Sequence, residues 1–150
     1  EETGLDRFFL AGLVYAESRG QPDAVSSAAA QGLCQIKAAT AYELAQRLGV
    51  EGAPPYPPAQ NLRLGAHYLQ DHLRRWNGNT DLALLAYRLG PNKVARLVEE
   101  AGSAEAWLEE LRRTDAGPWL YCVQIQAAAE RFRSRARIGT TRAWSDAREP

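Results

Sequence analysis

The chain has 150 residues, of which 45% are hydrophobic and 24% charged, and its 18 basic and 18 acidic side chains give a formal net charge of zero. A chain of this length forms one compact domain, and no apolar run approaches the ~20 residues that a membrane-spanning helix needs. The balanced charge excludes the broad positive field that gathers nucleic acid or an anionic membrane, so we expect a soluble, monomeric domain with neither partner.

The first helix of the chain is predicted by apolar residues at helical spacing. Such spacing recurs along nearly the whole sequence and no segment alternates as a strand, which indicates an all-α fold. The apolar face of the first helix comprises Leu5, Phe8, Phe9, Leu13 and Ala16. This helix should end near residues 18–20, because Gly20 permits a left-handed exit, and Glu17 then lies in its last turn. The small, polar residues 21–31 are expected to form a loop.

The middle of the chain alternates predicted helices with strong breaks. Thr40 resembles a helix N-cap, with Glu43 completing a capping box, for a helix over residues 40–48. Residues 50–60 contain four prolines and must form an extended connection. Asn61 is then expected to cap a long helix through residue 76.

The second half of the chain predicts four further helices, over residues 80–89, 91–100, 103–113 and 118–137. In the last of these we expect the buried side chains to be Leu120, Val123, Ala127 and Phe132. The polar residues 138–150 are expected to form a loosely packed tail. The sequence therefore predicts one helical domain over residues 1–137, followed by that tail.

The cysteines and histidines indicate no metal and no cofactor. Cys34 and Cys122 lack paired Cys-x-x-Cys spacing, and they are compatible either with two buried thiols or with a single disulfide. His67 and His72 are five residues apart on one predicted helix, or about 140° around its axis, unlike the paired histidines of a zinc helix. The first four residues do not resemble a signal peptide, so the chain is either cytoplasmic or a trimmed mature domain.

Glu17 is the first candidate for chemistry. In the last turn of a helix its carboxyl group faces the negative end of the helix dipole, and partial burial adds a desolvation cost. Both effects favour the neutral acid, which is the form that a general acid needs.

Several segments in a fixed order resemble a known family. They read YAESRG, AVSSAAAQGLCQI and GNTDLALLAYRLGP, with Asn61, Gly65 and Tyr68 between the second and the third. Together they resemble the catalytic domain of soluble lytic transglycosylases, lysozyme-like enzymes that cut peptidoglycan, over about residues 5–98. The resemblance implies a lysozyme-like helical fold with a groove for glycan strands, and a periplasmic or cell-wall location for the mature domain.

The resemblance also implies a role for each matching residue. Glu17 would be the sole catalytic acid and base, first protonating the bond between N-acetylmuramic acid and N-acetylglucosamine and then closing a 1,6-anhydro ring. Ser18 and Ser26 would support the reacting sugar, Gln35 would line the cleft, and the Tyr87 hydroxyl would orient the carboxyl group. Ser18 as a simple helix-end residue and Tyr87 as a core aromatic residue are the alternatives.

Four positions depart from the family pattern. Cys34 replaces a methionine, and Ala29 stands where glycine is common, so we expect the loop to avoid positive φ at that residue. Arg88 and Leu89 replace Asn-Ala. Arg88 either approaches Glu17 and favours its carboxylate, or binds an acidic peptide stem or lactyl carboxylate at the cleft mouth.

Two other functions compete with this prediction. One is a hydrolase of the goose-type lysozyme kind, in which an aspartate positions water, and Asp23 and Asp81 are the available acids. The other is a catalytically silent cell-wall-binding domain, favoured by Arg88 and Ala29 and opposed by the intact Glu17, Gln35 and Tyr87.

Overall fold

The computed structural model describes residues 3–114 and 117–146, with side chains as far as residue 138. The elements follow in the order α1 (Arg7–Ser18), β1 (Ala30–Gln31), β2 (Ile36–Lys37), α2 (Ala38–Leu48), α3 (Pro58–Arg75), α4 (Thr80–Leu89), α5 (Pro91–Glu100), α6 (Ala104–Arg113) and α7 (Gly117–Asp146). The predicted all-α class is confirmed. No helix in the described part of the chain combines the length and the apolar composition needed to cross a membrane.

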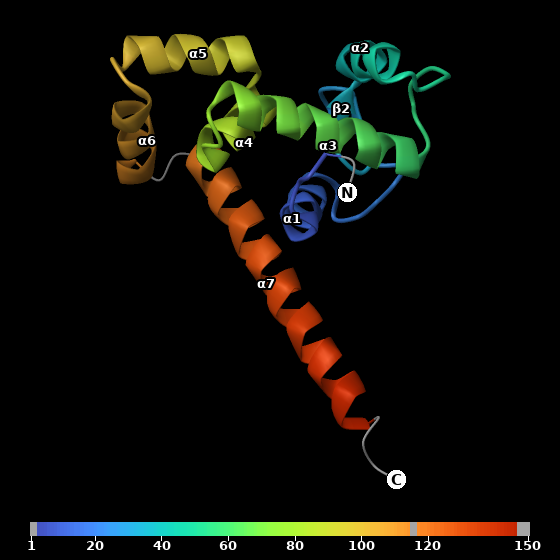
Figure 1. Ribbon diagram of the computed structural model, residues 1–150. Coiled ribbons are helices and arrows are strands. Elements are labelled where there is room, and N and C mark those ends of the chain that lie inside the picture. Colours follow the sequence, from blue (N-terminus) through green and yellow to red (C-terminus); the bar gives the residue numbers. More distant parts are fainter. Residues whose placement is uncertain (1–2, 115–116, 147–150) are drawn as a thin grey trace.

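Helix α4 lies at the centre of the larger of two hydrophobic clusters. Its residues 82–87 are all buried, and they pack with side chains from α1, α3, α5, α6 and α7. In Figure 1, α3 runs across the molecule from the α5–α6 pair at one end to α2 and the strands at the other. The second cluster lies at the α2 end, and the half-buried Leu10 and Tyr68 pack against both clusters.

A short antiparallel ribbon corrects the expectation that no strand would form. Strands β1 and β2 pair with Ala30 opposite Lys37 and Gln31 opposite Ile36. Two residues in each strand are too few for an alternating pattern to be visible in the sequence. The ribbon turns the chain back over residues 32–35, which reach the site described below.

Two predicted helix starts are wrong. Helix α2 begins at Ala38, so Thr40 lies inside it and its N-cap residue, Lys37, makes no side-chain cap hydrogen bond. Helix α3 begins at Pro58 rather than after Asn61, because proline fits the first helical turn, where its missing N–H group needs no partner. Asn61 is consequently a buried residue within α3.

The buried face of α7 also differs from the prediction. Leu120 is 45% exposed and Val123 42% exposed, and Ala127 is exposed as well. The buried residues are instead Tyr121, Cys122, Ile125, Ala128 and Ala129. Helix α7 lies against α1 (Figure 1), and a Cβ atom on Gly12 would lie 2.5 Å from the Ile125 carbonyl oxygen. The close helix contact therefore selects the face that carries the small residues Ala128 and Ala129.

The structure also bears on the expected tail, on the two cysteines and on Ala29. Helix α7 continues to Asp146, through most of the residues expected as a loose tail, and residues 147–150 lie outside the described part. Cys34 and Cys122 are both buried free thiols, which decides between the two alternatives left open for them. Ala29 has a φ of 58°, so the loop does adopt the left-handed conformation there, without the glycine that would accommodate it.

Candidate active site

Glu17 lies in the last turn of α1, which ends at Arg19 in a left-handed C-cap. Its side chain is half-buried rather than free in solvent. The Tyr121 hydroxyl, from α7, donates a hydrogen bond of 2.5 Å to Oε1 of Glu17. Because α1 and α7 pack along each other, the contact is built into the helix arrangement.

Three effects determine the pKa of Glu17, and the net direction is upward. Burial raises the pKa most strongly, because a desolvated carboxylate is less stable than the neutral acid. The Tyr121 hydrogen bond and the positive charge of Arg88 both lower the pKa and oppose this effect. Glu17 is therefore a carboxyl group that can give up a proton and take it back, as general acid–base chemistry requires.

Tyr87 does not make the contact that was expected of it. Its hydroxyl donates a 2.8 Å hydrogen bond to the Cys34 carbonyl oxygen, so the phenol that orients Glu17 is Tyr121 and not Tyr87. Tyr87 is nearly buried, as its core-aromatic alternative required, and it also lines the cleft that contains Glu17. It fixes the loop between β1 and β2 against α4.

Gln35 and Ser26 lie at the cleft, on the loops around the ribbon. Gln35 has a φ of 48°, and its Nε2 donates to the carbonyl oxygens of Ala24 and Gly32, both at 2.9 Å. Ser26 is exposed, and its hydroxyl accepts a 3.1 Å hydrogen bond from the Ala30 N–H. The structure therefore brings both residues to the same cleft as Glu17.

Ser18 is the predicted site residue that the structure keeps out of the cleft. It is buried, and its hydroxyl lies 2.8 Å from the Leu33 carbonyl oxygen and 3.1 Å from that of Val14, as a donor to both. It also accepts a 3.2 Å hydrogen bond from the Gly20 N–H. Ser18 joins the end of α1 to the loop before Gln35, which corrects its expected role beside the sugar.

Asn61 is a site-building residue whose role the sequence did not indicate. Its Oδ1 accepts a 2.8 Å hydrogen bond from the Cys34 N–H, and its Nδ2 donates to the Gln31 carbonyl oxygen at 3.1 Å. A side chain on Gly32 would lie within 2.6 Å of the Asn61 amide, and one on Gly65 within 2.4 Å of the Cys34 sulfur. The two glycines let the loop between β1 and β2 approach α3 closely enough for Asn61 to hydrogen-bond to that loop.

Arg88 lines the cleft from the last turn of α4, and its side chain is exposed. Its guanidinium carbon lies 4.6 Å from the centroid of the Tyr121 ring, in cation–π contact. The same tyrosine donates a hydrogen bond to Glu17, so the guanidinium and the carboxyl group both contact Tyr121. The positive charge of Arg88 lowers the pKa of Glu17. The arrangement has a feature of each alternative for Arg88, because its charge lowers the pKa of Glu17 while its exposed guanidinium lines the cleft.

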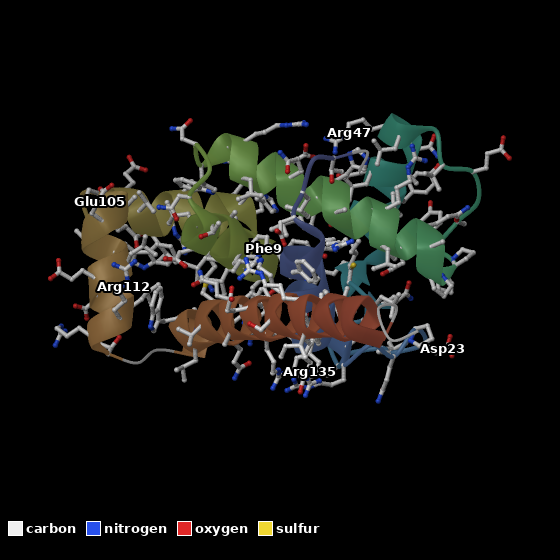
Figure 2. All side chains as sticks on the ribbon, turned by 60° about the horizontal axis from the view of Figure 1, so that its bottom comes forward. Phe9, Asp23, Arg47, Glu105, Arg112 and Arg135 are labelled. Carbon is white, nitrogen blue, oxygen red and sulfur yellow. The ribbon has the colours of Figure 1, made fainter. Side chains whose placement is uncertain are left out.

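The cleft has a volume of about 620 Å³. Its lining residues are Glu17, Ser26, Ala28, Ala30, Gln35, Ile36, Lys37, Thr40, Tyr68, Tyr87, Arg88, Leu89, Gly90 and Pro91. Glu17 is the one carboxyl group among these described residues. Asp81 instead pairs with Arg112 at 3.2 Å, and Figure 2 shows Asp23 at the edge of the molecule.

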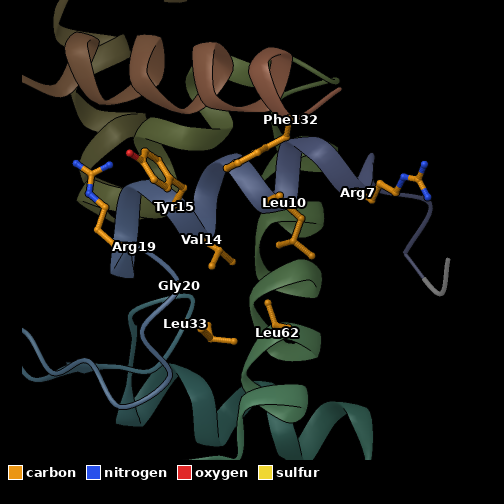
Figure 3. Close-up of a pocket in the computed structure, with 10 residues that line it drawn as sticks. Arg7, Leu10, Val14, Tyr15, Arg19, Gly20, Leu33, Leu62 and Phe132 are labelled. Carbon is orange, nitrogen blue, oxygen red and sulfur yellow. The ribbon is translucent and has the colours of Figure 1, made fainter. Parts of the chain in front are cut away.

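A second cavity, of about 430 Å³, lies between α1, α3 and α7 (Figure 3). Its walls are mainly apolar, with Leu10, Val14, Leu33 and Leu62 facing one another and Arg7 and Arg19 at its ends. No carboxyl group is among the described residues that line it, so this cavity offers no group for acid–base chemistry. Among the described residues, no group of His, Cys, Asp and Glu side chains is arranged to hold a metal ion.

Comparison with known families agrees with this geometry. The family model described as Transglycosylase SLT domain matches residues 1–109. The chain belongs to this family. It is 43% identical over 90 residues to the transglycosylase of Enterobacteria phage PRD1, covering 60% of this chain and 31% of that protein. It is also 37% identical over 71 residues to an endo-type membrane-bound lytic murein transglycosylase A of Salmonella enteritidis, covering 44% of this chain and 35% of that one.

Solved structures of this SLT-domain fold superpose over most of the chain. An inactive mutant of the lytic transglycosylase Slt from Pseudomonas aeruginosa matches with a TM-score of 0.77 and 26% identity, over 91% of this chain and 23% of that one. The 70 kDa soluble lytic transglycosylase from Escherichia coli matches with a TM-score of 0.72 at 21% identity, over 88% of this chain and 22% of that one. The latter likeness shows the fold alone. The chain spans about a third or less of the length of these relatives.

Proposed function

We propose that this SLT domain is a peptidoglycan lytic transglycosylase that cleaves the β-1,4 bond between N-acetylmuramic acid and N-acetylglucosamine, with Glu17 as its acid and base. The observation that carries the proposal is the single, half-buried carboxyl group in the cleft, held by the Tyr121 hydroxyl. Most glycosidases use two carboxyl groups, one to protonate the leaving oxygen and one to attack or to activate water. A cleft with one such group suits a reaction that needs no second acid.

The proposed reaction uses Glu17 twice. Its acid form protonates the bridging oxygen as the bond to the muramic acid C1 breaks, and the substrate's N-acetyl group stabilises the positive carbon. The Glu17 carboxylate then removes the proton from the 6-hydroxyl of the same sugar, whose oxygen bonds to C1. The proton given in the first step returns in the second, no water is consumed, and the product is a 1,6-anhydromuramyl end.

The other cleft residues support this reaction in our proposal. Ser26, Gln35 and Tyr87 form polar walls against which a sugar can bind, and Arg88 offers a cation to an anionic substituent. We infer that the domain acts where peptidoglycan lies, in the periplasm or at the cell wall. One of its relatives is named a lytic murein transglycosylase, which supports this inference.

Digestion of purified peptidoglycan followed by mass analysis of the released fragments tests the proposal. We expect fragments that lack a reducing end and are lighter by one water than the products of hydrolysis. Fragments with reducing ends would identify a hydrolase instead. Binding to sacculi without any released fragment would identify a silent binding domain.

A further inference from the structure

Tyr121 contacts both the exposed guanidinium of Arg88 and the half-buried carboxyl group of Glu17. The guanidinium of Arg88 lies over the face of the Tyr121 ring, with its central carbon 4.6 Å from the ring centroid. At the other end of that residue, the hydroxyl donates to Glu17 Oε1. The soluble lytic transglycosylase pattern that this chain resembles has an uncharged asparagine at position 88, so the cation is a feature of this chain.

Arg88 forms no ion pair among the described residues, although its positive charge lowers the pKa of Glu17. Other exposed arginines of the chain do pair, as Arg96 pairs with Glu100 at 3.4 Å and Arg112 with Asp81 at 3.2 Å. A guanidinium at the wall of a binding cleft is suited to bind a carboxylate through two parallel hydrogen bonds. Arg88 is therefore available to an anionic group on the substrate.

Three titratable groups near Glu17 are uncharged at neutral pH. They come from three elements, with Cys34 on the loop between the strands, Tyr87 on α4 and Tyr121 on α7. Burial raises the pKa of all three, that of Cys34 to about 12. Lys37 also lines the cleft but is exposed and does not shift the pKa of Glu17. The charge that acts on Glu17 is that of Arg88.

We propose that Arg88 binds a carboxylate on the substituent of the muramic acid and that this binding promotes protonation of Glu17, an inference that rests on the proposed function. In the free protein the cation favours the Glu17 carboxylate. A bound substrate carboxylate cancels the field of Arg88, so the desolvated Glu17 takes a proton from solvent. The anionic substrate thus generates the acid that begins its own cleavage, whereas an uncharged substrate does not.

Matched substrates of the two charge states test the inference. Two kinds of glycan strand are used. One bears stem peptides, and the other is freed of peptide so that its lactyl carboxylates are exposed. Each is compared with the same strand after its carboxylates are converted to amides. For each, kcat and kcat/KM are measured against pH. The alkaline limb of kcat/KM reports the acid in the free protein, and that of kcat reports it in the complex.

The wild-type protein should show the kcat limb at higher pH than the kcat/KM limb on a carboxylate substrate, and coincident limbs on the amide. A charge-assisted hydrogen bond to the carboxylate should also give it about tenfold higher kcat/KM at neutral pH. Arg88→Gln should abolish both the separation of the limbs and the higher kcat/KM on the carboxylate substrate. Arg88→Lys should keep the limb separation, because it keeps the charge, while Arg96→Gln controls for the loss of an exposed arginine elsewhere.

The outcomes separate this inference from the proposed function. Wild-type protein that cleaves both substrates with coincident limbs overturns the inference and leaves the function standing. Wild-type protein that cleaves no strand at any pH overturns the function as well. A separation of the kcat and kcat/KM limbs on stem-free strands identifies the lactyl carboxylate as the group that Arg88 binds. A separation of these limbs only on stem-bearing strands identifies a peptide carboxylate. Should Arg88→Gln fail to fold, the wild-type comparison of carboxylate with amide decides alone.

Discussion

The Tyr121 hydroxyl, on α7, donates a 2.5 Å hydrogen bond to a carboxyl oxygen of Glu17, on α1 and 104 residues earlier in the chain. The two residues meet because Gly12 lets α7 pack closely against α1. The bond lowers the pKa of Glu17 while burial raises it. The acid strength of the proposed catalytic group therefore depends on the packing of two helices.

Replacing this phenol should lower activity in a protein that still folds. Tyr121→Phe removes a hydrogen bond to a charged group, worth about 1.5–3 kcal/mol, so we expect kcat on peptidoglycan to fall about ten- to a hundredfold. Because the bond lowers the pKa of Glu17, its loss raises that pKa and moves the alkaline limb of activity to higher pH. Tyr42→Phe, at an exposed tyrosine of α2, is the control. A Tyr121→Phe protein with wild-type rate and pH profile would show that the bond plays no part.

The loop that carries Gln35 should depend on Asn61 for its stability. Asn61→Ala leaves the Cys34 N–H and the Gln31 carbonyl without their partner in a buried environment. Each unsatisfied group costs about 1–3 kcal/mol, so we expect the free energy of unfolding in urea to fall by about 2–6 kcal/mol. Asn92→Ala, at an exposed position of α5, should change it by less than about 0.5 kcal/mol. Equal effects of the two substitutions would argue against this role.

The sequence predicted the helices far better than the contacts between them. Apolar spacing placed α1 closely, and the breaks before Thr80 and at Gly90 placed α4, whose residues 82–87 are buried on all sides. In α7 the apolar residues lie on two faces, and Leu120 and Val123 are as apolar as Tyr121 and Ile125. Periodicity alone cannot choose between such faces, since the choice depends on Gly12 in another helix.

The site was predicted in part for the same reason. Its position in the last turn of α1 made Glu17 a candidate, and the family resemblance assigned it the catalytic role. That Tyr121 rather than Tyr87 contacts it depends on how distant helices pack. Asn61 was interpreted as a helix cap because asparagine favours that position, and its two bonds to the loop are 27 and 30 residues distant in sequence. A buried amide that holds a loop has no local pattern.

Ala29 should be a position where glycine improves stability. Its φ of 58° costs an L-residue about 1–2 kcal/mol, whereas glycine costs about 0.4–1 kcal/mol through a more flexible unfolded chain. Ala29→Gly should therefore raise the free energy of unfolding by about 0.5–1 kcal/mol. Ala28→Gly, at a neighbour without positive φ, should lower it. If both substitutions lower it equally, the left-handed conformation is not costly at Ala29.

Acid should destabilise the protein through His72. This side chain is buried, and burial lowers its pKa from 6.5 to about 4. Between pH 4 and pH 6.5 the His72 side chain binds a proton in the unfolded chain but not in the folded protein. Its contribution to the free energy of unfolding is therefore fully present above pH 6.5 and is lost as the pH falls toward 4. The loss should be on the order of 2–3 kcal/mol.

Urea unfolding of the wild type and of His72→Leu at pH 7 and pH 4.5 measures this contribution. The leucine variant should lose less stability on acidification than the wild type, whatever its stability at pH 7. The same loss in both proteins would assign the acid sensitivity to other groups.

The central claim is that the Glu17 carboxyl group performs the bond cleavage, and Glu17→Gln tests it most directly. The amide keeps an oxygen that can accept the Tyr121 hydrogen bond, so the variant should fold like the wild type by circular dichroism and thermal unfolding. Release of soluble fragments from purified peptidoglycan should fall by at least about 10²–10⁴-fold, while Glu109→Gln, at an exposed position of α6, should retain the wild-type rate. A folded Glu17→Gln protein that releases fragments at a rate near that of the wild type would contradict the account.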